Sequence, residues 1–250
     1  MDANETTKSK AATRLVDEEI RVSNALIRGA HSLSLSEKRI VYICLSKLQE
    51  DCLIDGRYKF RLTAKEFSEA FEIDLDTAYT QLKSAKRLMK KVARTIEETP
   101  EGEKEQIFVW VSGVTYHHGE GWVEIGFSHE MTPHLFEIKL SNGFTRYYLK
   151  QTSALRSVYA WRLFELMMQF KSSGLLKIGI EDFYYAMEAP LSCRKDFFNL
   201  KKRIIEPAVN ELREKNNMQI VWKYKKKDSR KVTGLEFRFN KNTNAETLLD

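Results

Sequence analysis

At residues 178–204 the chain reads IGIEDFYYAMEAPLSCRKDFFNLKKRI, and at residues 62–88 it reads LTAKEFSEAFEIDLDTAYTQLKSAKRL. The two segments align without a gap at an offset of 116 residues, and Lys86-Arg87 falls on Lys202-Arg203. Few positions are identical, so the alignment alone could arise by chance. A duplicated structural unit would also repeat the order of the elements around it.

The same order of predicted elements surrounds both segments. Each copy has an amphipathic helix, a short strand, a short helix, a turn, a longer basic helix and two strands joined by a polar turn. Winged helix-turn-helix modules have this order, so we predict an α+β fold of two tandem winged-helix domains related by pseudo-two-fold symmetry. The predicted elements are the helices 36–49 and 153–171, the strands 58–62 and 175–178, short helices that begin near Lys65 and Glu181, and the strand pairs 107–114 with 122–127 and 219–224 with 235–239.

The composition favours a soluble protein with an anionic partner. The 250 residues are 42% hydrophobic, and 41 Lys and Arg against 35 Asp and Glu give a net charge of +6. Nucleic acid is the first candidate partner and a membrane surface the second. Cys44, Cys52 and Cys193 form no CxxC pair, which favours a reducing cytosol without disulfides. No apolar run approaches the roughly 20 residues that span a bilayer, so we expect no membrane partner.

A helical wheel separates residues 195–213 into an apolar face and a cationic face. Leu200 and Ile204 belong to the apolar face, which would pack on the rest of the domain. Lys202 and Arg203 belong to the opposite face, which would be free to meet DNA. Because a helix-turn-helix places its second helix in the major groove, this face is the predicted recognition surface.

Two residues interrupt this pattern. Lys201 projects toward the apolar side, where its stem could lie on the core with the ammonium reaching out. Pro207 should kink the helix or begin a new turn. The first copy is predicted to behave alike, with Leu82, Ala85, Leu88, Met89, Val92 and Ile96 buried and Lys83, Lys86, Arg87, Lys90 and Arg94 facing outward.

The second copy is the more basic of the two. From Arg194 to Lys231 it has 13 Lys and Arg against 5 Asp and Glu, and its polar turn could lie along a phosphate backbone. The alternative interpretation is a solvated charged surface that only promotes solubility. The predicted DNA-binding residues are Lys83, Lys86, Arg87, Lys90, Arg194, Lys195, Asn199, Lys201, Lys202, Arg203, Lys225, Lys226, Lys227, Arg230 and Lys231.

Three features could indicate an enzyme, and none satisfies the geometry. His117 and His118 are adjacent, so they would point to opposite sides of a strand. His129 and His134 are five residues apart with Pro133 between them, whereas a zincin motif needs four on a helix. No GxxxxGK[ST] occurs. We therefore predict no catalytic activity, no metal site and no cofactor.

Three stretches together carry a resemblance to a known family. They are FTRYYLKQTSALRSVYAWRLFELMMQF at 144–170, LKKRIIEPAVNEL at 200–212 and SLSLSEKRIVYICLSKL at 32–48. These stretches, in their order along the chain, resemble the replication initiators of iteron-bearing plasmids, and the resemblance covers about residues 23 to 240. The resemblance implies a protein of the bacterial cytosol that binds directly repeated origin sites on double-stranded DNA as a monomer, melts an adjacent AT-rich segment and recruits host replication proteins and chaperones. It also implies a homodimer, in equilibrium with the monomer, that represses the initiator's own gene at an operator inverted repeat.

Domain boundaries follow from the repeat and the resemblance. We predict flexible tails at 1–22 and 241–250, a first winged-helix domain at 23–146 for DNA contact and dimerisation, and a second at 147–240 as the main DNA-binding domain. The apolar strand of the first domain supplies the candidate dimer contact, which is Phe108, Trp110 and Val111. A dimeric winged-helix repressor without a replication role is the alternative function, and a protein-interaction module with a basic surface is a third.

Overall fold

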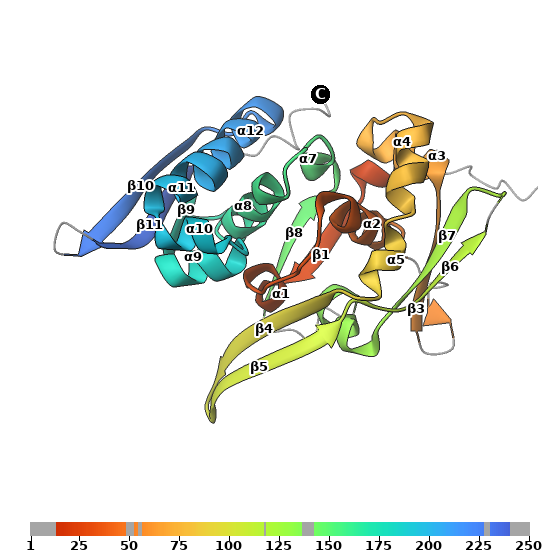
Figure 1. Cartoon of the computed structure of the whole chain (residues 1–250), viewed down its shortest axis with the longest axis horizontal. Coiled ribbons are helices and arrows are strands. Elements are labelled where there is room, and N and C mark those ends of the chain that lie inside the picture. Colours follow the sequence, from red (N-terminus) through yellow and green to blue (C-terminus); the bar gives the residue numbers. More distant parts are fainter. Residues whose placement is uncertain are drawn as a thin grey trace, which may run out of the picture.

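The computed structural model describes residues 14–48, 53–54, 57–117, 119–136, 143–227 and 231–240. Two winged-helix units lie side by side, the N-terminal unit in red to yellow-green and the C-terminal unit in green to blue (Figure 1). Between them lie a two-stranded sheet, formed by β1 (Glu19–Ser23) and β8 (Phe144–Tyr148), and helix α8 (Val158–Met168). The predicted fold class, an α+β protein of two tandem winged helices, is confirmed.

The N-terminal unit is built on a four-stranded antiparallel sheet. Its elements are η1 Leu15–Asp17, α1 Asn24–Arg28, α2 Leu35–Ser46, β2 Leu53–Ile54, β3 Arg57–Thr63, α3 Ala64–Phe71, α4 Leu75–Leu82, α5 Ala85–Leu88, β4 Val92–Thr99, β5 Gly102–Val109, β6 Val111–His117, β7 Trp122–Phe127, η3 His129–Met131 and α6 Thr132–Leu135. The strand order is β2–β3–β7–β6, with β6 and β7 forming the wing. Strands β4 and β5 form a separate hairpin that extends away from this sheet (Figure 1).

Two capping boxes fix where the first helices begin. The Ser34 hydroxyl accepts a hydrogen bond from the Glu37 backbone N–H, and the Glu37 carboxylate accepts one from the Ser34 N–H. Thr63 and Glu66 make the same pair of bonds at the start of α3. Each box satisfies backbone donors that a helix N-terminus otherwise leaves unpaired. The cap at Thr63 therefore places the helix-turn-helix directly at the end of strand β3.

The C-terminal unit repeats this plan on a three-stranded sheet. Its elements are α7 Lys150–Ser153, α8, β9 Leu175–Gly179, α9 Ile180–Ala186, α10 Leu191–Lys195, α11 Phe197–Leu200, a π-helical turn Lys201–Ile205, α12 Glu206–Asn216, β10 Ile220–Lys227 and β11 Lys231–Phe239. The strand order is β10–β11–β9, and Phe237 of β11 pairs opposite Leu176 of β9. Both side chains are buried beneath the helices.

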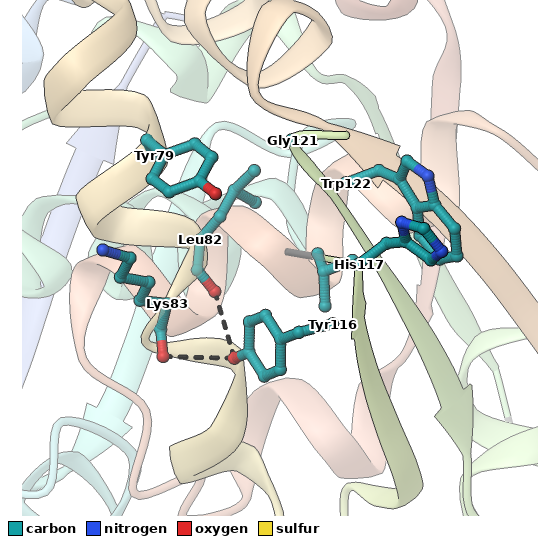
Figure 2. A pocket seen from close by; sticks show the side chains of 8 residues that line it. Tyr79, Leu82, Lys83, Tyr116, His117, Gly121 and Trp122 are labelled. Atoms are coloured by element: carbon teal, nitrogen blue, oxygen red, sulfur yellow. Dashed lines mark hydrogen bonds between the residues drawn. The ribbon is translucent and has the colours of Figure 1, made fainter. Parts of the chain in front are cut away.

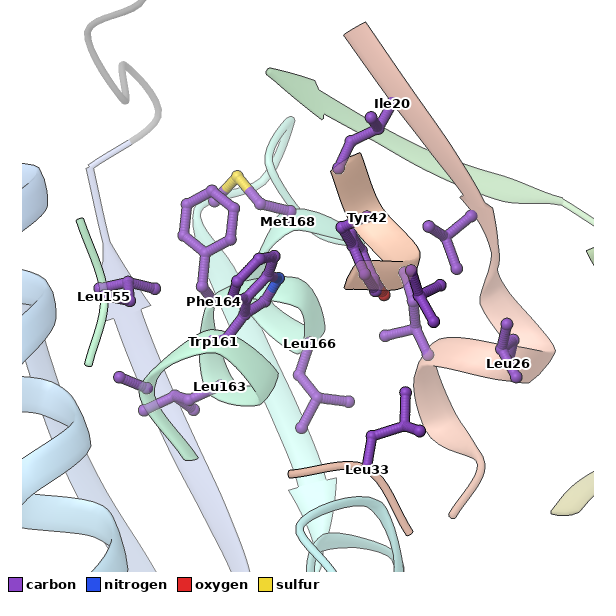
Figure 3. Close-up of a cluster of buried hydrophobic side chains, with 14 of the residues drawn as sticks. Ile20, Leu26, Leu33, Tyr42, Leu155, Trp161, Leu163, Phe164, Leu166 and Met168 are labelled. Carbon is purple, nitrogen blue, oxygen red and sulfur yellow. The ribbon is translucent and has the colours of Figure 1, made fainter. Parts of the chain in front are cut away.

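The junction between the units is a continuous apolar core. Trp161 and Phe164 of α8 and Tyr42 of α2 lie in it, close to Ile20 of β1 (Figure 3). The rings of Tyr42 and Trp161 meet edge to face with centroids 5.1 Å apart, a favoured aromatic geometry. Helix α8 therefore joins the two units through packed side chains.

A charged pair is enclosed in this core. The Lys38 ammonium lies 2.7 Å from the Glu165 carboxylate, and the two side chains are 0% and 1% exposed. Tyr147 donates a hydrogen bond to the same carboxylate at 2.7 Å, and Trp161 donates one to the Tyr147 hydroxyl at 3.1 Å. Burial lowers the pKa of Lys38 from 10.5 to about 8, against the opposing effect of Glu165. The adjacent Glu165 carboxylate favours the charged form of Lys38.

The prediction of one long basic helix in the first copy, running from Leu82 to Ile96, is wrong. Helix α4 ends at Leu82, α5 has only four residues, and a strand begins at Val92. In that strand Ala93 and Thr95 are buried while Val92 and Ile96 are exposed, which is the two-residue period of a strand. Pairing with β5 across the hairpin stabilises the strand. This pairing decides the conformation, although the apolar residues of the segment have helical spacing. Met89, also predicted to be buried, is exposed.

Two smaller predictions are corrected. Part of the predicted N-terminal tail is ordered secondary structure: Leu15–Asp17 form η1, and β1 begins at Glu19, with Ile20 and Val22 buried. Residues 1–13 and 241–250 lie outside the described residues. The predicted helix 153–171 is divided, and Ser157 caps the start of α8. The prediction that Pro207 kinks the helix or begins a new turn is confirmed. A π-helical turn precedes it and α12 begins at Glu206, because the proline ring and its missing N–H disturb the preceding turn.

Candidate nucleic-acid interface

The C-terminal helix-turn-helix presents its cations on one side. Helix α9 is its first helix, and the stretch from α10 to α12 is its second. Leu200 and Ile204 are buried, and α12 packs against α8. Lys202 and Arg203 are exposed, so the predicted division into an apolar and a cationic face is confirmed. The role of the cationic face in binding DNA stays a prediction at this point.

Contacts within the unit hold several neighbouring polar side chains. The Arg194 Nε donates a hydrogen bond to the Ala189 carbonyl at 2.7 Å, which fixes the turn before α10. The Asn199 amide donates to the Asp196 carboxylate at 2.9 Å. Lys201, which the wheel placed toward the apolar side, is partly buried, and its ammonium lies 3.4 Å from the Glu206 carboxylate. Lys195 is exposed.

Strands β10 and β11 form the wing of the C-terminal unit, and lysines lie near its tip. Lys225 and Lys226 of β10 and Lys231 of β11 are exposed, and a register shift lies between Lys225 and Lys226. Lys227 ends β10, its side chain is outside the described residues, and Arg230 is outside them altogether. Nearer the sheet, Lys223 and Arg238 lie 3.2 Å and 3.1 Å from the buried Glu236 carboxylate. The hydrogen bond from Arg238 lowers the pKa of Glu236.

In the N-terminal unit the wing is hydrogen-bonded to the end of α4 and the start of α5, which form the second helix of the helix-turn-helix. The Tyr116 hydroxyl of β6 accepts a hydrogen bond from the Lys86 backbone N–H at 2.7 Å. It donates one to the Lys83 carbonyl at 3.1 Å (Figure 2). Burial raises the pKa of Tyr116, so its hydroxyl remains a donor. The predicted residues Lys83, Lys86, Arg87 and Lys90 are all exposed around this braced segment.

An aromatic and cationic stack lies at the tip of the same wing, where β6 ends and β7 begins. The rings of His117 and Trp122 are stacked with centroids 4.7 Å apart, and the Arg61 guanidinium lies 3.9 Å from the Trp122 ring centroid. Together with Tyr79, these rings line a small pocket between α4 and the wing (Figure 2). The stack ties Trp122 to the neighbouring strands β3 and β6.

The predicted dimer contact is wrong for this conformation. Phe108, Trp110 and Val111 are buried in the core of their own chain, and the Trp110 indole donates a hydrogen bond to the His31 carbonyl at 3.0 Å. The apolar side chains that strand β5 does expose are Ile107 at 54% and Val109 at 41%. Alternation along the strand explains the difference, since successive side chains point to opposite faces. Dimerisation through the first domain stays a prediction.

The histidines considered for metal binding have other partners. His134 contacts the Ser23 hydroxyl at 2.8 Å and stacks on Phe108. His117 is stacked on Trp122, and His118 lies outside the described residues. Within the described ranges, no group of three or more His, Cys, Asp and Glu side chains could hold a metal ion. In the same part of the chain, no helix has the length and apolar character to cross a bilayer.

Sequence reasoning missed two residues beside the predicted cations. Tyr116 had no usable signal, because its partners are backbone groups about 30 residues away on another element. Phe198 is exposed on α11, four residues before Lys202, and therefore on the same side of the helix. The helical wheel could have revealed Phe198, but apolar residues were expected only on the buried face.

Family models match both units. The model described as initiator replication protein, WH1, matches residues 19–168, and the model described as initiator Rep protein, WH2, matches residues 179–239. The chain belongs to the initiator replication protein family. This confirms the resemblance to replication initiators of iteron-bearing plasmids that three stretches of the sequence carry. The first match runs to the end of α8, beyond the predicted domain boundary at 146–147.

The chain is also similar to two curated relatives and to a solved structure. An uncharacterized 27.6 kDa protein of Escherichia coli is 27% identical over 230 residues, covering 87% of this chain and 94% of that protein. The PI protein of Escherichia coli is 22% identical over 271 residues, covering 96% and 84%. The crystal structure of the Pi initiator protein in complex with iteron DNA matches with a TM-score of 0.71 at 21% identity, covering 90% of this chain and 97% of that chain. The initiator therefore shares that fold over most of its length.

Proposed function

We propose that this initiator starts plasmid replication by binding directly repeated origin sites as a monomer, and that as a dimer it represses its own gene at an inverted repeat. Membership of the initiator family supports the replication role, and the similar Pi initiator was solved on iteron DNA. One observation carries the proposal furthest. A single chain has two helix-turn-helix units, and each exposes cations at its second helix.

The exposed cations would divide the work of binding. Lysine and arginine side chains on the recognition helices face base edges and phosphates, whereas the wing lysines lie along the backbone. Lys202 cannot make the bidentate fork that arginine makes to guanine, so Arg203 is the better candidate for that contact. Host replication proteins and chaperones are the further partners that family membership suggests.

The geometry of two linked helix-turn-helix units predicts the length of the DNA site. Successive major grooves on one face of a duplex are about 34–36 Å, or about 10–10.5 bp, apart. If each recognition helix reads about 4–5 bp, one monomer should protect roughly 18–22 bp. The exposed residues of the two helices differ, so we expect the two halves to be unlike and the site not to be a palindrome.

Footprinting of the full chain at a concentration where it is monomeric tests this prediction. Lys83→Ala/Lys86→Ala and Lys202→Ala/Arg203→Ala should each lose protection in a different half of the site. The second variant should lose more affinity, because the C-terminal unit has the larger local positive charge. A protected site of about one helical turn, about 10 bp, would refute binding by both units, as would loss of the same half in both variants.

A further inference from the structure

Two adjacent phenylalanines at the start of α11 have different surroundings. The Phe197 ring is partly buried and meets the Tyr224 ring with centroids 5.0 Å apart. The Phe198 ring is 64% exposed. A single exposed apolar side chain is common on protein surfaces and needs no function. Phe198 differs from the other exposed apolar residues because it lies in the proposed recognition helix and its ring also neighbours the Lys202 ammonium.

The backbone holds Phe198 within the cationic face. Its N–H donates to the Asp196 carboxylate at 2.9 Å, which caps α11 and fixes the first turn. Lys202 follows four residues later, on the same side of the helix, and its ammonium lies 5.9 Å from the centroid of the Phe198 ring. The ring therefore stands beside the cation that would reach the DNA.

The floor of the major groove offers one apolar group to such a ring. Thymine presents a C5-methyl group there beside its O4 acceptor, whereas cytosine presents an N4 donor and no methyl. A phenyl ring cannot exchange hydrogen bonds with base edges, and the ammonium of Lys202 can only donate. Phe198 and Lys202 side by side thus match a methyl group next to an acceptor.

We propose that Phe198 contacts the C5-methyl group of a thymine in the half-site read by the C-terminal unit, and so determines specificity at that base pair. This inference rests on the proposed function, because it requires the second recognition helix to lie in the major groove. The ligand class is a 5-methylpyrimidine. Lys202 would donate to the O4 of the same thymine or to a neighbouring phosphate.

Single-methyl deletion in the DNA provides the test. The probe is the duplex that the wild-type chain selects from a random-sequence pool, with each thymine replaced in turn by deoxyuridine, which lacks only the methyl. At one position in the second half-site, the wild type should bind the uracil duplex roughly fourfold more weakly, as expected for one buried methyl group. Phe198→Ala should bind the thymine and uracil duplexes equally, and Phe198→Leu should keep part of the discrimination.

Two variants are matched controls. Val221→Ala shortens another exposed apolar side chain on β10 and should retain the fourfold ratio of the wild type. Lys202→Ala should bind both the thymine and the uracil duplex more weakly than the wild type does. The ratio between the two affinities should stay fourfold, because the methyl contact remains. Circular dichroism would show that each variant is folded, as expected for changes at exposed positions.

The outcomes separate this inference from the function beneath it. Equal discrimination by Phe198→Ala and the wild type, or no thymine whose methyl matters, would overturn the role of Phe198 while sequence-specific binding stands. A wild-type chain that selects no sequence from the pool would overturn the proposed function, and the Phe198 contact with it.

Discussion

Replacement of Lys202 and Arg203 together by alanine should weaken specific DNA binding on the order of 100-fold, because two charge-assisted hydrogen bonds are lost. Both side chains are exposed, so the free energy of unfolding should change by less than about 0.5 kcal/mol. The slope of log affinity against log salt should become shallower by no more than about 1, because Lys202 would contact one phosphate at most and Arg203 is proposed to contact guanine. Gel shifts over a salt series and urea unfolding measure the two quantities.

Matched variants show whether the effect belongs to this face. Lys171→Ala/Lys215→Ala removes the same charge from two exposed positions outside the proposed interface, and it should bind almost as the wild type does. Leu200→Ala removes a buried side chain of the same helix and should cost about 2–5 kcal/mol of stability. If the cation pair destabilised the fold as much as Leu200→Ala, the assignment of the two helix faces would be reversed.

Lys38→Met should lower the free energy of unfolding by about 3–5 kcal/mol, because it leaves the Glu165 carboxylate buried without its cation. This is a large share of the about 5–15 kcal/mol that stabilises a typical domain. The change lies in the junction core and not at the candidate interface. Urea unfolding followed by tryptophan fluorescence is the measurement, since Trp161 lies beside the pair.

A double variant tests the physical reason for this loss. Lys38→Met/Glu165→Leu removes both charges and should recover most of the stability, because well-packed apolar side chains can replace a buried ion pair. The Tyr147 hydroxyl loses its acceptor in that variant, so recovery should be incomplete. A double variant less stable than Lys38→Met would mean that the carboxylate is held mainly by its hydrogen-bonding tyrosine, contrary to our account.

The second copy was the more predictable part of the fold. The stretch around Leu200 and Ile204 has a helical period and a single buried side, and this pattern survives in the structure. The first copy failed after Leu82, because strand pairing with β5 decides the conformation of Val92 to Thr99. The pairing with β5 cannot be read from the local sequence, so the helical spacing of the apolar residues led to a wrong prediction of helix there.

The junction could not be read from sequence for a related reason. Lys38 lies in a helix that looked amphipathic, yet it is fully buried against a carboxylate 127 residues away. The three residues Phe108, Trp110 and Val111 were assigned to a dimer contact because their strand is apolar, and they fill the core instead. The positive charges in the sequence identified the cations of the candidate interface. They give no signal for the uncharged Tyr116, whose hydroxyl is hydrogen-bonded to the backbone of Lys83 and Lys86.

Replication in trans tests the central claim most directly. A circle that cannot replicate by itself would carry the direct repeats bound by this chain and an adjacent AT-rich segment, and a bacterial host would supply the chain from a separate gene. We predict that the circle is maintained with the wild type and lost with Lys202→Ala/Arg203→Ala. Failure of the wild type to maintain a circle whose repeats it demonstrably protects would contradict initiation and favour a repressor without a replication role.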